Sequence, residues 1–223
     1  MTLFLLAIAP SMIIIIYIYI KDKFEKEPWK LLVKNFFLGA TLSVAATFGL
    51  GKLLTDFLPS LSNESLLDMF IKAFIVVALV EEFSKYVIVR YFAQRNKAFN
   101  EPFDGIVYAV MVSMGFATLE NVLYVYSYGF ETGILRAFTA VPAHATFAIL
   151  MGYFMGKAKF SENRFMLNMT GLFVAVLFHG AYDYFLFINF VPGIAIGAFA
   201  SLIVGLVLAR KAMKTHQKNS LFR

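Results

Sequence analysis

The chain has 223 residues, of which 60% are hydrophobic and only 15% are charged. This composition leaves too little polar surface for a water-soluble domain of this length, and it predicts a helical membrane protein. We attribute the net charge of +6 to basic cytoplasmic loops rather than to nucleic-acid binding. Because there is no cysteine, disulfides and thiolate chemistry are excluded.

Several apolar stretches approach or exceed the ~20 residues needed to cross a bilayer. In chain order we expect seven spans, at residues 2–20, 31–58, 67–92, 105–128, 132–156, 166–188 and 190–209. The first has no basic segment before it and no small-residue cleavage site, so we expect a retained helix rather than a removed signal peptide. No repeat or soluble domain is evident. Residues 1–223 are therefore expected to form one integral-membrane domain, an all-α bundle.

Lys and Arg are concentrated in alternate loops, which lie at 21–34, 90–97, 157–164 and 210–223. The loops between them, around 59–66, 129–133 and 188–192, contain neither residue type. The positive-inside rule therefore predicts an outside N-terminus and a cytoplasmic C-terminus. We expect a short polar turn from Pro59 to Glu64. His216, in the basic tail, is expected to be solvated and without function.

Ionisable residues inside apolar spans are rare and costly, so each one is a candidate functional residue. Two adjacent carboxylates, Glu81 and Glu82, lie in the middle of the third span. Four such residues each fall some 12 to 15 residues into their span, at a common depth; they are Glu81, Glu120, His144 and His179. The sequence therefore predicts that four helices contribute to one polar layer near the middle of the membrane.

The spacing of neighbouring residues adds detail to this layer. Lys85 follows Glu81 by four residues, and Asp183 follows His179 by four, so each pair lies on one helix face. Phe116 and Glu120 have the same spacing, and Asn121 is adjacent to Glu120. Pro142, two residues before His144, is expected to weaken the local helix and admit water.

Each group also has a purely structural interpretation. Glu81 and Lys85 can form a neutral ion pair within one helix, and His179 with Asp183 can form an ordinary buried hydrogen bond. Glu120 with Asn121 can join two helices, and His144 alone can be a satisfied buried histidine. The common depth of all of them favours a functional site.

Three kinds of function use such residues. In hydrolysis, a glutamate deprotonates a water molecule and a His or Asn stabilises the oxyanion, or the His and Glu side chains hold a zinc ion. The alternative is a proton-coupled transporter, which also places acids inside a bundle. Transporters often contain inverted repeats, and none is evident here. A non-catalytic membrane scaffold is the third interpretation.

Four segments together resemble the PrsW family of bacterial intramembrane proteases, within the CAAX-protease and bacteriocin-processing superfamily. The segments are Glu81–Lys85 (EEFSK), Phe116–Asn121 (FATLEN), Pro142–His144 (PAH) and His179–Asp183 (HGAYD). They occur in the family's order, and the similarity covers almost the whole chain. Any one segment alone is a weak signal, whereas the set is specific.

The resemblance implies a multi-pass peptidase of the bacterial cell membrane. In this family the characteristic reaction is the first, site-1 cut in a membrane-spanning anti-sigma factor, which leads to release of a sigma factor in the response to envelope stress. The expected partners are accordingly the lipid bilayer and a membrane-spanning protein substrate, with no nucleic acid.

By the same resemblance, Glu81 is expected to be the general base, supported by Glu82. His179 and Asp183 match the final motif, which stabilises an oxyanion or binds a metal. The related CAAX proteases have a histidine where this chain has Glu120 and an arginine near Lys85, so His144 is the residue available to assist the base. We favour a glutamate-activated water without metal, and zinc stays open. Its candidate ligands are His144, His179, Glu81 and Glu120.

Overall fold

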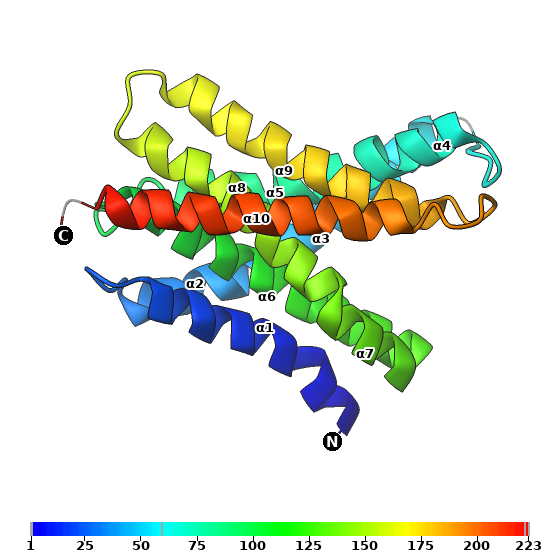
Figure 1. Cartoon of the computed structure of the whole chain (residues 1–223), viewed down its shortest axis with the longest axis horizontal. Coiled ribbons are helices and arrows are strands. Elements are labelled where there is room, and N and C mark those ends of the chain that lie inside the picture. Colours follow the sequence, from blue (N-terminus) through cyan, green and yellow to red (C-terminus); the bar gives the residue numbers. More distant parts are fainter. Residues whose placement is uncertain (1, 59, 221, 223) are drawn as a thin grey trace.

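The computed structural model describes residues 2–58, 60–220 and 222, and its regular elements are all helical (Figure 1). Pro59, at the start of the predicted polar turn, lies outside the described residues, as does Arg223 of the basic tail. In chain order the elements are α1 (Thr2–Lys21), α2 (Trp29–Leu38), η1 (Gly39–Ser43), α3 (Val44–Phe57), α4 (Leu66–Phe70), η2 (Ile71–Leu79), α5 (Val80–Ile88), η3 (Val89–Ala93), α6 (Pro102–Tyr128), α7 (Phe130–Phe138), α8 (Ala140–Lys159), α9 (Arg164–Phe187) and α10 (Ile196–Lys218). The η elements are π-helical stretches within longer helices.

Six helical segments of the described chain are long and apolar enough to cross a membrane. They are Thr2–Lys21, Trp29–Phe57, Pro102–Tyr128, Phe130–Lys159, Arg164–Phe187 and Ile196–Lys218. The predicted span at 67–92 corresponds to α4 through η3, an uninterrupted helix from Leu66 to Ala93. At ~1.5 Å per residue this helix is long enough to cross a membrane. It is not among the six apolar helices because it carries charged residues at its centre and near both ends.

Helix α6 is the centre of the bundle. It begins at Pro102 after a capping box formed by Glu101 and Asp104, and its most extensive contacts are with α8. The two helix backbones touch at a pair of glycines, because a Cβ atom on Gly105 would overlap the carbonyl of Gly152 and the reverse. Small residues allow such close packing of membrane helices. The site residues of α6 and α8 are therefore held on adjacent backbones.

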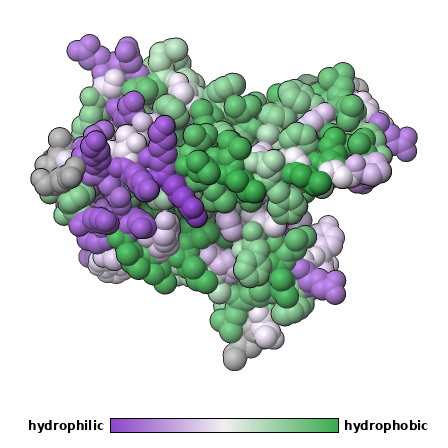
Figure 2. Space-filling view, viewed as in Figure 1, coloured by the Kyte–Doolittle hydropathy of each residue, from purple (hydrophilic) through white to green (hydrophobic). Residues whose placement is uncertain are grey.

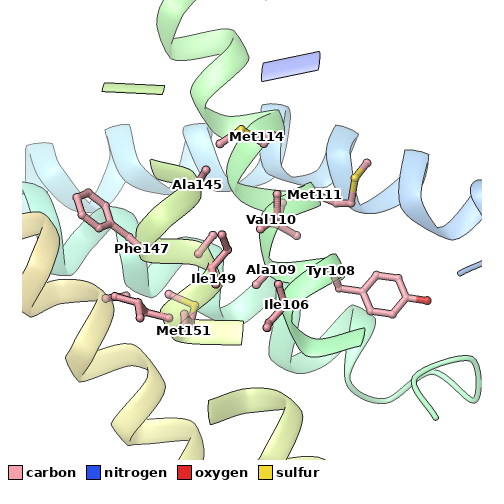
Figure 3. Close-up of a cluster of buried hydrophobic side chains, with 14 of the residues drawn as sticks. Ile106, Tyr108, Ala109, Val110, Met111, Met114, Ala145, Phe147, Ile149 and Met151 are labelled. Atoms are coloured by element: carbon pink, nitrogen blue, oxygen red, sulfur yellow. The ribbon is translucent and has the colours of Figure 1, made fainter. Parts of the chain in front are cut away.

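The apolar core lies along this α6–α8 contact. Figure 3 shows side chains from the two helices meeting there, with Val110 and Met114 of α6 facing the α8 side chains Ala145 and Ile149. Phe147, on the same helix as Ala145, is also almost completely buried. It extends this core to the polar residues described below.

Much of the outer surface is apolar. Large side chains such as Ile13, Phe48, Phe173 and Ile203 are more than 60% exposed, as expected for residues that face lipid rather than water. Figure 2 shows hydrophilic residues gathered at the end of the molecule where α10 finishes, beside a broad apolar surface. The basic residues at that end of α10 are Arg210, Lys211, Lys214 and Lys218.

The prediction for the last segment was wrong in two respects. The final helix covers Ile196–Lys218 rather than 190–209, so the basic tail continues the helix. His216 is 2% exposed, and its Nε2 atom lies 2.9 Å from the carbonyl oxygen of Tyr153, on whose ring it stacks. It is a buried packing residue because the helix continues past the apolar stretch and docks on α8.

The predicted span at 132–156 is divided into α7 and α8 by a break at Thr139. Pro142 explains the position of the break, because a proline ring clashes with the carbonyl four residues earlier, here that of Phe138. The sequence predicted that Pro142 disturbs the helix. The result is that Pro142 lies in the first turn of α8, and α7 takes a new direction (Figure 1).

Candidate active site

Glu81 and Glu82 lie in the first turn of helix α5, which follows the π-helical segment η2 without a break. Both carboxylates are buried, together with Lys85 one turn further on. The Lys85 ammonium lies 2.8 Å from Oε1 of Glu82 and 3.2 Å from Oε2 of Glu81. Buried charges are tolerated only when they are paired and hydrogen-bonded. Lys85 is therefore the local counter-charge of the carboxylate pair.

His144, on α8, connects this pair to Glu120 on α6. Its Nδ1 atom lies 3.4 Å from the Lys85 ammonium, and its Nε2 atom lies 2.9 Å from Oε2 of Glu120. An ammonium can only donate, so Nδ1 accepts from Lys85, and Nε2 then carries the proton that is donated to Glu120. The lone pair of Nδ1 thus faces the Lys85 ammonium, which is paired with Glu81 and Glu82.

His179, on α9, faces a carboxylate with each of its ring nitrogens. Its Nδ1 atom lies 2.9 Å from Oε1 of Glu82, and its Nε2 atom lies 3.2 Å from Oδ2 of Asp183. The two histidine rings are perpendicular, with centroids 5.3 Å apart, and Phe147 stacks on His179. Each histidine therefore has one nitrogen toward the centre and the other held by a carboxylate.

The structure brings together all the residues that the sequence placed in one polar layer. Glu81 and Glu82 come from α5, Glu120 from α6, His144 from α8, and His179 with Asp183 from α9. Two supporting residues are also nearby. The Phe116 ring lies under the Lys85 ammonium, 4.1 Å from its centroid, and Asn121 donates to the carbonyl oxygen of Ala7.

Arg136, which was not predicted from the sequence, also belongs to this network. Its Nη2 atom lies 2.6 Å from Oε2 of Glu120, and its Nε atom lies 2.9 Å from Oδ1 of Asn121. The break at Thr139 turns α7 so that Arg136 reaches α6. Arg136 falls inside the predicted span at 132–156, so the rule that singled out the other ionisable residues also applied to it.

Two cavities meet at Glu81 and Glu120. The larger, about 410 Å³, is lined by residues of η2 and α5 to α9, including Arg136, His144, His179 and Asp183. The smaller, about 270 Å³, lies between α3 and α6. Figure 2 shows the molecule hollowed between the lobe that holds α4 and the lobe that holds α7. Glu81 lines both cavities, whereas Glu82 lines neither, so Glu81 is the member of the pair that a water molecule and a substrate can reach.

Four side chains at the centre could hold a metal ion: Glu81, Glu82, His144 and His179 offer ligand atoms that all lie within 4.8 Å of one another. Two imidazoles and two carboxylates suit zinc. Metal-binding histidines typically donate their other ring N–H to a carboxylate, and here Nε2 of His144 faces Glu120 and Nε2 of His179 faces Asp183. The types of residue fit zinc, and the Lys85 ammonium, which contacts Glu81, Glu82 and His144, competes with a metal ion for them. Glu82, rather than the predicted Glu120, is the second carboxylate of this donor set. Glu120 contacts the Nε2 atom of His144 instead.

Buried Glu and His side chains around a cavity, inside a bundle of membrane-spanning helices, mark a functional site and suit an intramembrane hydrolase. Comparison with known proteins agrees. A family model described as PrsW family intramembrane metalloprotease matches residues 27–210. Relatives named Protease PrsW include that of Clostridioides difficile (strain 630), 39% identical over 196 residues, which cover 84% of this chain and 80% of the relative.

The relative from Geobacillus kaustophilus (strain HTA426) is 37% identical over 80% of this chain and 77% of its own length. That from Bacillus subtilis (strain 168) is 34% identical over 80% of each chain. No solved structure matches the chain. The chain belongs to the PrsW family of intramembrane proteases. It is a membrane peptidase and a multi-pass protein of the cell membrane, which favours the peptidase interpretation over the transporter.

Proposed function

We propose that this chain hydrolyses a peptide bond of a membrane-spanning protein, with Glu81 as the base that activates the attacking water. The observation that carries this proposal is the accessibility of Glu81: it lines both cavities, while Glu82 is held on one oxygen by Lys85 and His179. A base must lie within hydrogen-bond reach of the water that it deprotonates. Among the paired carboxylates, Glu81 meets this condition.

The proposed reaction has two proton transfers. Glu81 takes a proton from the water while the water oxygen adds to the scissile carbonyl carbon. The proton then passes from Glu81 to the leaving nitrogen as the carbon–nitrogen bond breaks, and a carboxylic acid and an amine are formed. Lys85 is buried between Glu81 and His144 and lines neither cavity, so it balances the charge of the carboxylates. His179, which lines the larger cavity, is the residue placed to stabilise the negative charge on the carbonyl oxygen.

The remaining residues position these groups. Glu120 fixes the ring of His144, and Asp183 fixes that of His179. Arg136, on α7, forms a salt bridge with Glu120. Glu81, Glu82, His144 and His179 would hold a zinc ion, which would supply a Lewis acid for the carbonyl and for the attacking water. Glu81 would then be a metal ligand, and it acts as the base on the water only in the reaction without metal.

For the substrate, we propose the one that the resemblance implies, a membrane-spanning anti-sigma factor cut on its extracytoplasmic side in the response to envelope stress. We propose seven spans for the same chain, with Leu66–Ala93 as the third, the N-terminus outside and the C-terminus in the cytoplasm. The alternation of basic and non-basic loops supports this orientation. We also propose that residues 1–223 form a single integral-membrane domain.

The orientation has a direct test, since the chain contains no cysteine. Ser62→Cys places a single thiol in the non-basic loop around 59–66, and Glu162→Cys places a single thiol in the basic loop at 157–164. A membrane-impermeant thiol reagent added to intact cells is expected to label Ser62→Cys and to leave Glu162→Cys unlabelled until the cells are opened. The reverse pattern would contradict the proposed orientation.

The reaction is tested with purified protein in liposomes and a panel of single-span substrates that carry short extracytoplasmic tails. Mass spectrometry of the products locates the cleaved bond. Wild type and Glu64→Gln, a change at an exposed loop carboxylate, are expected to cleave at the same bond, whereas Glu81→Gln is expected to leave the substrate intact. Equal cleavage by Glu81→Gln would remove Glu81 as the base.

A further inference from the structure

A second group of acidic residues lies where the loop between α1 and α2 packs against the start of α6. Asp22, Glu27 and Asp104 are fully or almost fully buried there, and Glu25 is partly buried. They belong to neither of the two cavities at Glu81. The proposed peptidase reaction gives them no role.

Only some of the carboxylate oxygens in this group have hydrogen-bond donors. Oδ2 of Asp104 accepts from the backbone N–H groups of Asn100 and Glu101, at 2.7 and 2.8 Å. Oε2 of Glu27 accepts from the Tyr108 hydroxyl, and Figure 3 shows this hydroxyl directed away from the apolar cluster. The second oxygen of each residue, Oδ1 of Asp104 and Oε1 of Glu27, has no partner. The same is true of Oε2 of Glu25, whereas the Asp22 carboxylate has only the backbone N–H of Glu27 close to it.

No lysine or arginine of the described residues forms a direct ion pair with these buried carboxylates. Lys26, in the same loop, donates to the backbone carbonyls of Tyr19 and Asp22 instead of to a carboxylate. Buried carboxylate oxygens without donors are costly, and a buried charge is normally paired or bound to a metal.

We propose that Glu25, Glu27 and Asp104 bind one hard divalent cation, of the Mg²⁺, Mn²⁺ or Ca²⁺ class, which fastens the loop between α1 and α2 to the start of α6. Their ligand oxygens all lie within 4.8 Å of one another, a separation that oxygens on one such ion adopt at ~2.0–2.6 Å from the metal. The donors are oxygen atoms alone, which favours these ions over zinc.

The competing occupant is a proton shared between carboxylates. Burial and the neighbouring Asp104 raise the pKa of Glu27 well above its usual value, and burial raises the pKa of Asp22 to about 6. Protons would therefore neutralise the group when no cation is bound. The experiment has to separate these two occupants, and it has to separate this site from the one at Glu81.

Mn²⁺ is the probe, followed by electron paramagnetic resonance during titration of the full-length purified protein. Wild type and Glu81→Gln are both expected to bind one Mn²⁺ that excess Mg²⁺ or Ca²⁺ displaces, because this site is independent of the proposed peptidase centre. Glu27→Gln keeps an oxygen for Tyr108 but removes the charge, and it is expected to bind at least tenfold more weakly. Asp56→Asn, at an exposed carboxylate, is the matched control and is expected to bind as wild type does.

If Glu27→Gln folds poorly, thermal unfolding of the wild-type protein with and without Mn²⁺ provides a second test of the site. Saturating Mn²⁺ is expected to raise the Tm of wild type and of Asp56→Asn equally. The absence of saturable Mn²⁺ binding and of a Tm shift in wild type would overturn the proposal and leave protons as the occupants. Mn²⁺ binding that Glu81→Gln abolishes and Glu27→Gln preserves would overturn it as well.

Discussion

Oε2 of Glu120 lies 2.9 Å from Nε2 of His144, the ring nitrogen opposite to the one that faces Lys85. This contact fixes both the orientation of the imidazole and the nitrogen that carries its proton. Glu120 therefore acts on the centre through His144, although its own carboxylate also borders the cavity.

Replacing Glu120 by Gln is expected to lower kcat by about 10- to 100-fold with little change in KM, because the histidine loses its acceptor but the substrate site is unchanged. Glu120→Asp, which keeps the charge, is expected to recover part of the loss. Steady-state cleavage of one substrate by the three proteins measures the effect. A change confined to KM would contradict the positioning role of Glu120.

Arg136→Met is expected to reduce kcat about tenfold or more, because a charge-assisted hydrogen bond to Glu120 is worth about 1.5–3 kcal/mol. Arg136→Lys is expected to retain part of the activity, since it keeps the charge but loses the bond to Asn121. Arg95→Met, at an exposed arginine, serves as the control. Equal activity of Arg136→Met and Arg95→Met would exclude Arg136 from the network.

Removal of metal tests the fit of the four-residue donor set. Zinc bound by these four residues predicts that a chelator abolishes cleavage and that added zinc restores it. His144→Ala and His179→Ala are expected to lower the zinc content of the purified protein, while His216→Ala, at a buried histidine elsewhere, leaves it unchanged. Undiminished cleavage by zinc-free protein would instead support the glutamate mechanism without metal.

The backbone contact between α6 and α8 predicts a large effect of a small substitution. Gly152→Ala is expected to destabilise the protein by about 1–3 kcal/mol, because the added methyl group overlaps the backbone of Gly105 and Ile106. Gly49→Ala, whose Cβ meets no atom within 4 Å, is expected to be neutral or slightly stabilising. Unfolding in detergent measures both, and similar values for the two would contradict this packing.

The sequence was sufficient to predict the helical class and the residues of the polar centre, because hydrophobic spans exclude Glu and His unless these side chains have a role. It was not sufficient for the pairwise contacts. That Glu82, rather than Glu120, joins Glu81 and the two histidines depends on the rotation of α5 and α6 about their axes. Hydropathy carries no information about such rotations.

Other differences have local causes. The tail beyond residue 209 is polar, so hydropathy placed the helix end too early, although the tail residue His216 packs on Tyr153. Arg136 joins the site only because the chain changes direction at Thr139. Glu25 and Glu27, in the loop between α1 and α2, lie close to Asp104 of α6. These segments are far apart in the sequence, and no motif predicts that they meet.

The most direct test of the account is cleavage of one single-span substrate by wild type and Glu81→Gln, reconstituted at equal amounts and with matched unfolding temperatures. General-base catalysis typically contributes about 10²–10⁴-fold, so the account predicts at least a hundredfold slower cleavage by Glu81→Gln at the same bond. Cleavage within a few-fold of wild type would contradict the assignment of Glu81 as the base and of this cavity as the place where the peptide bond is cut.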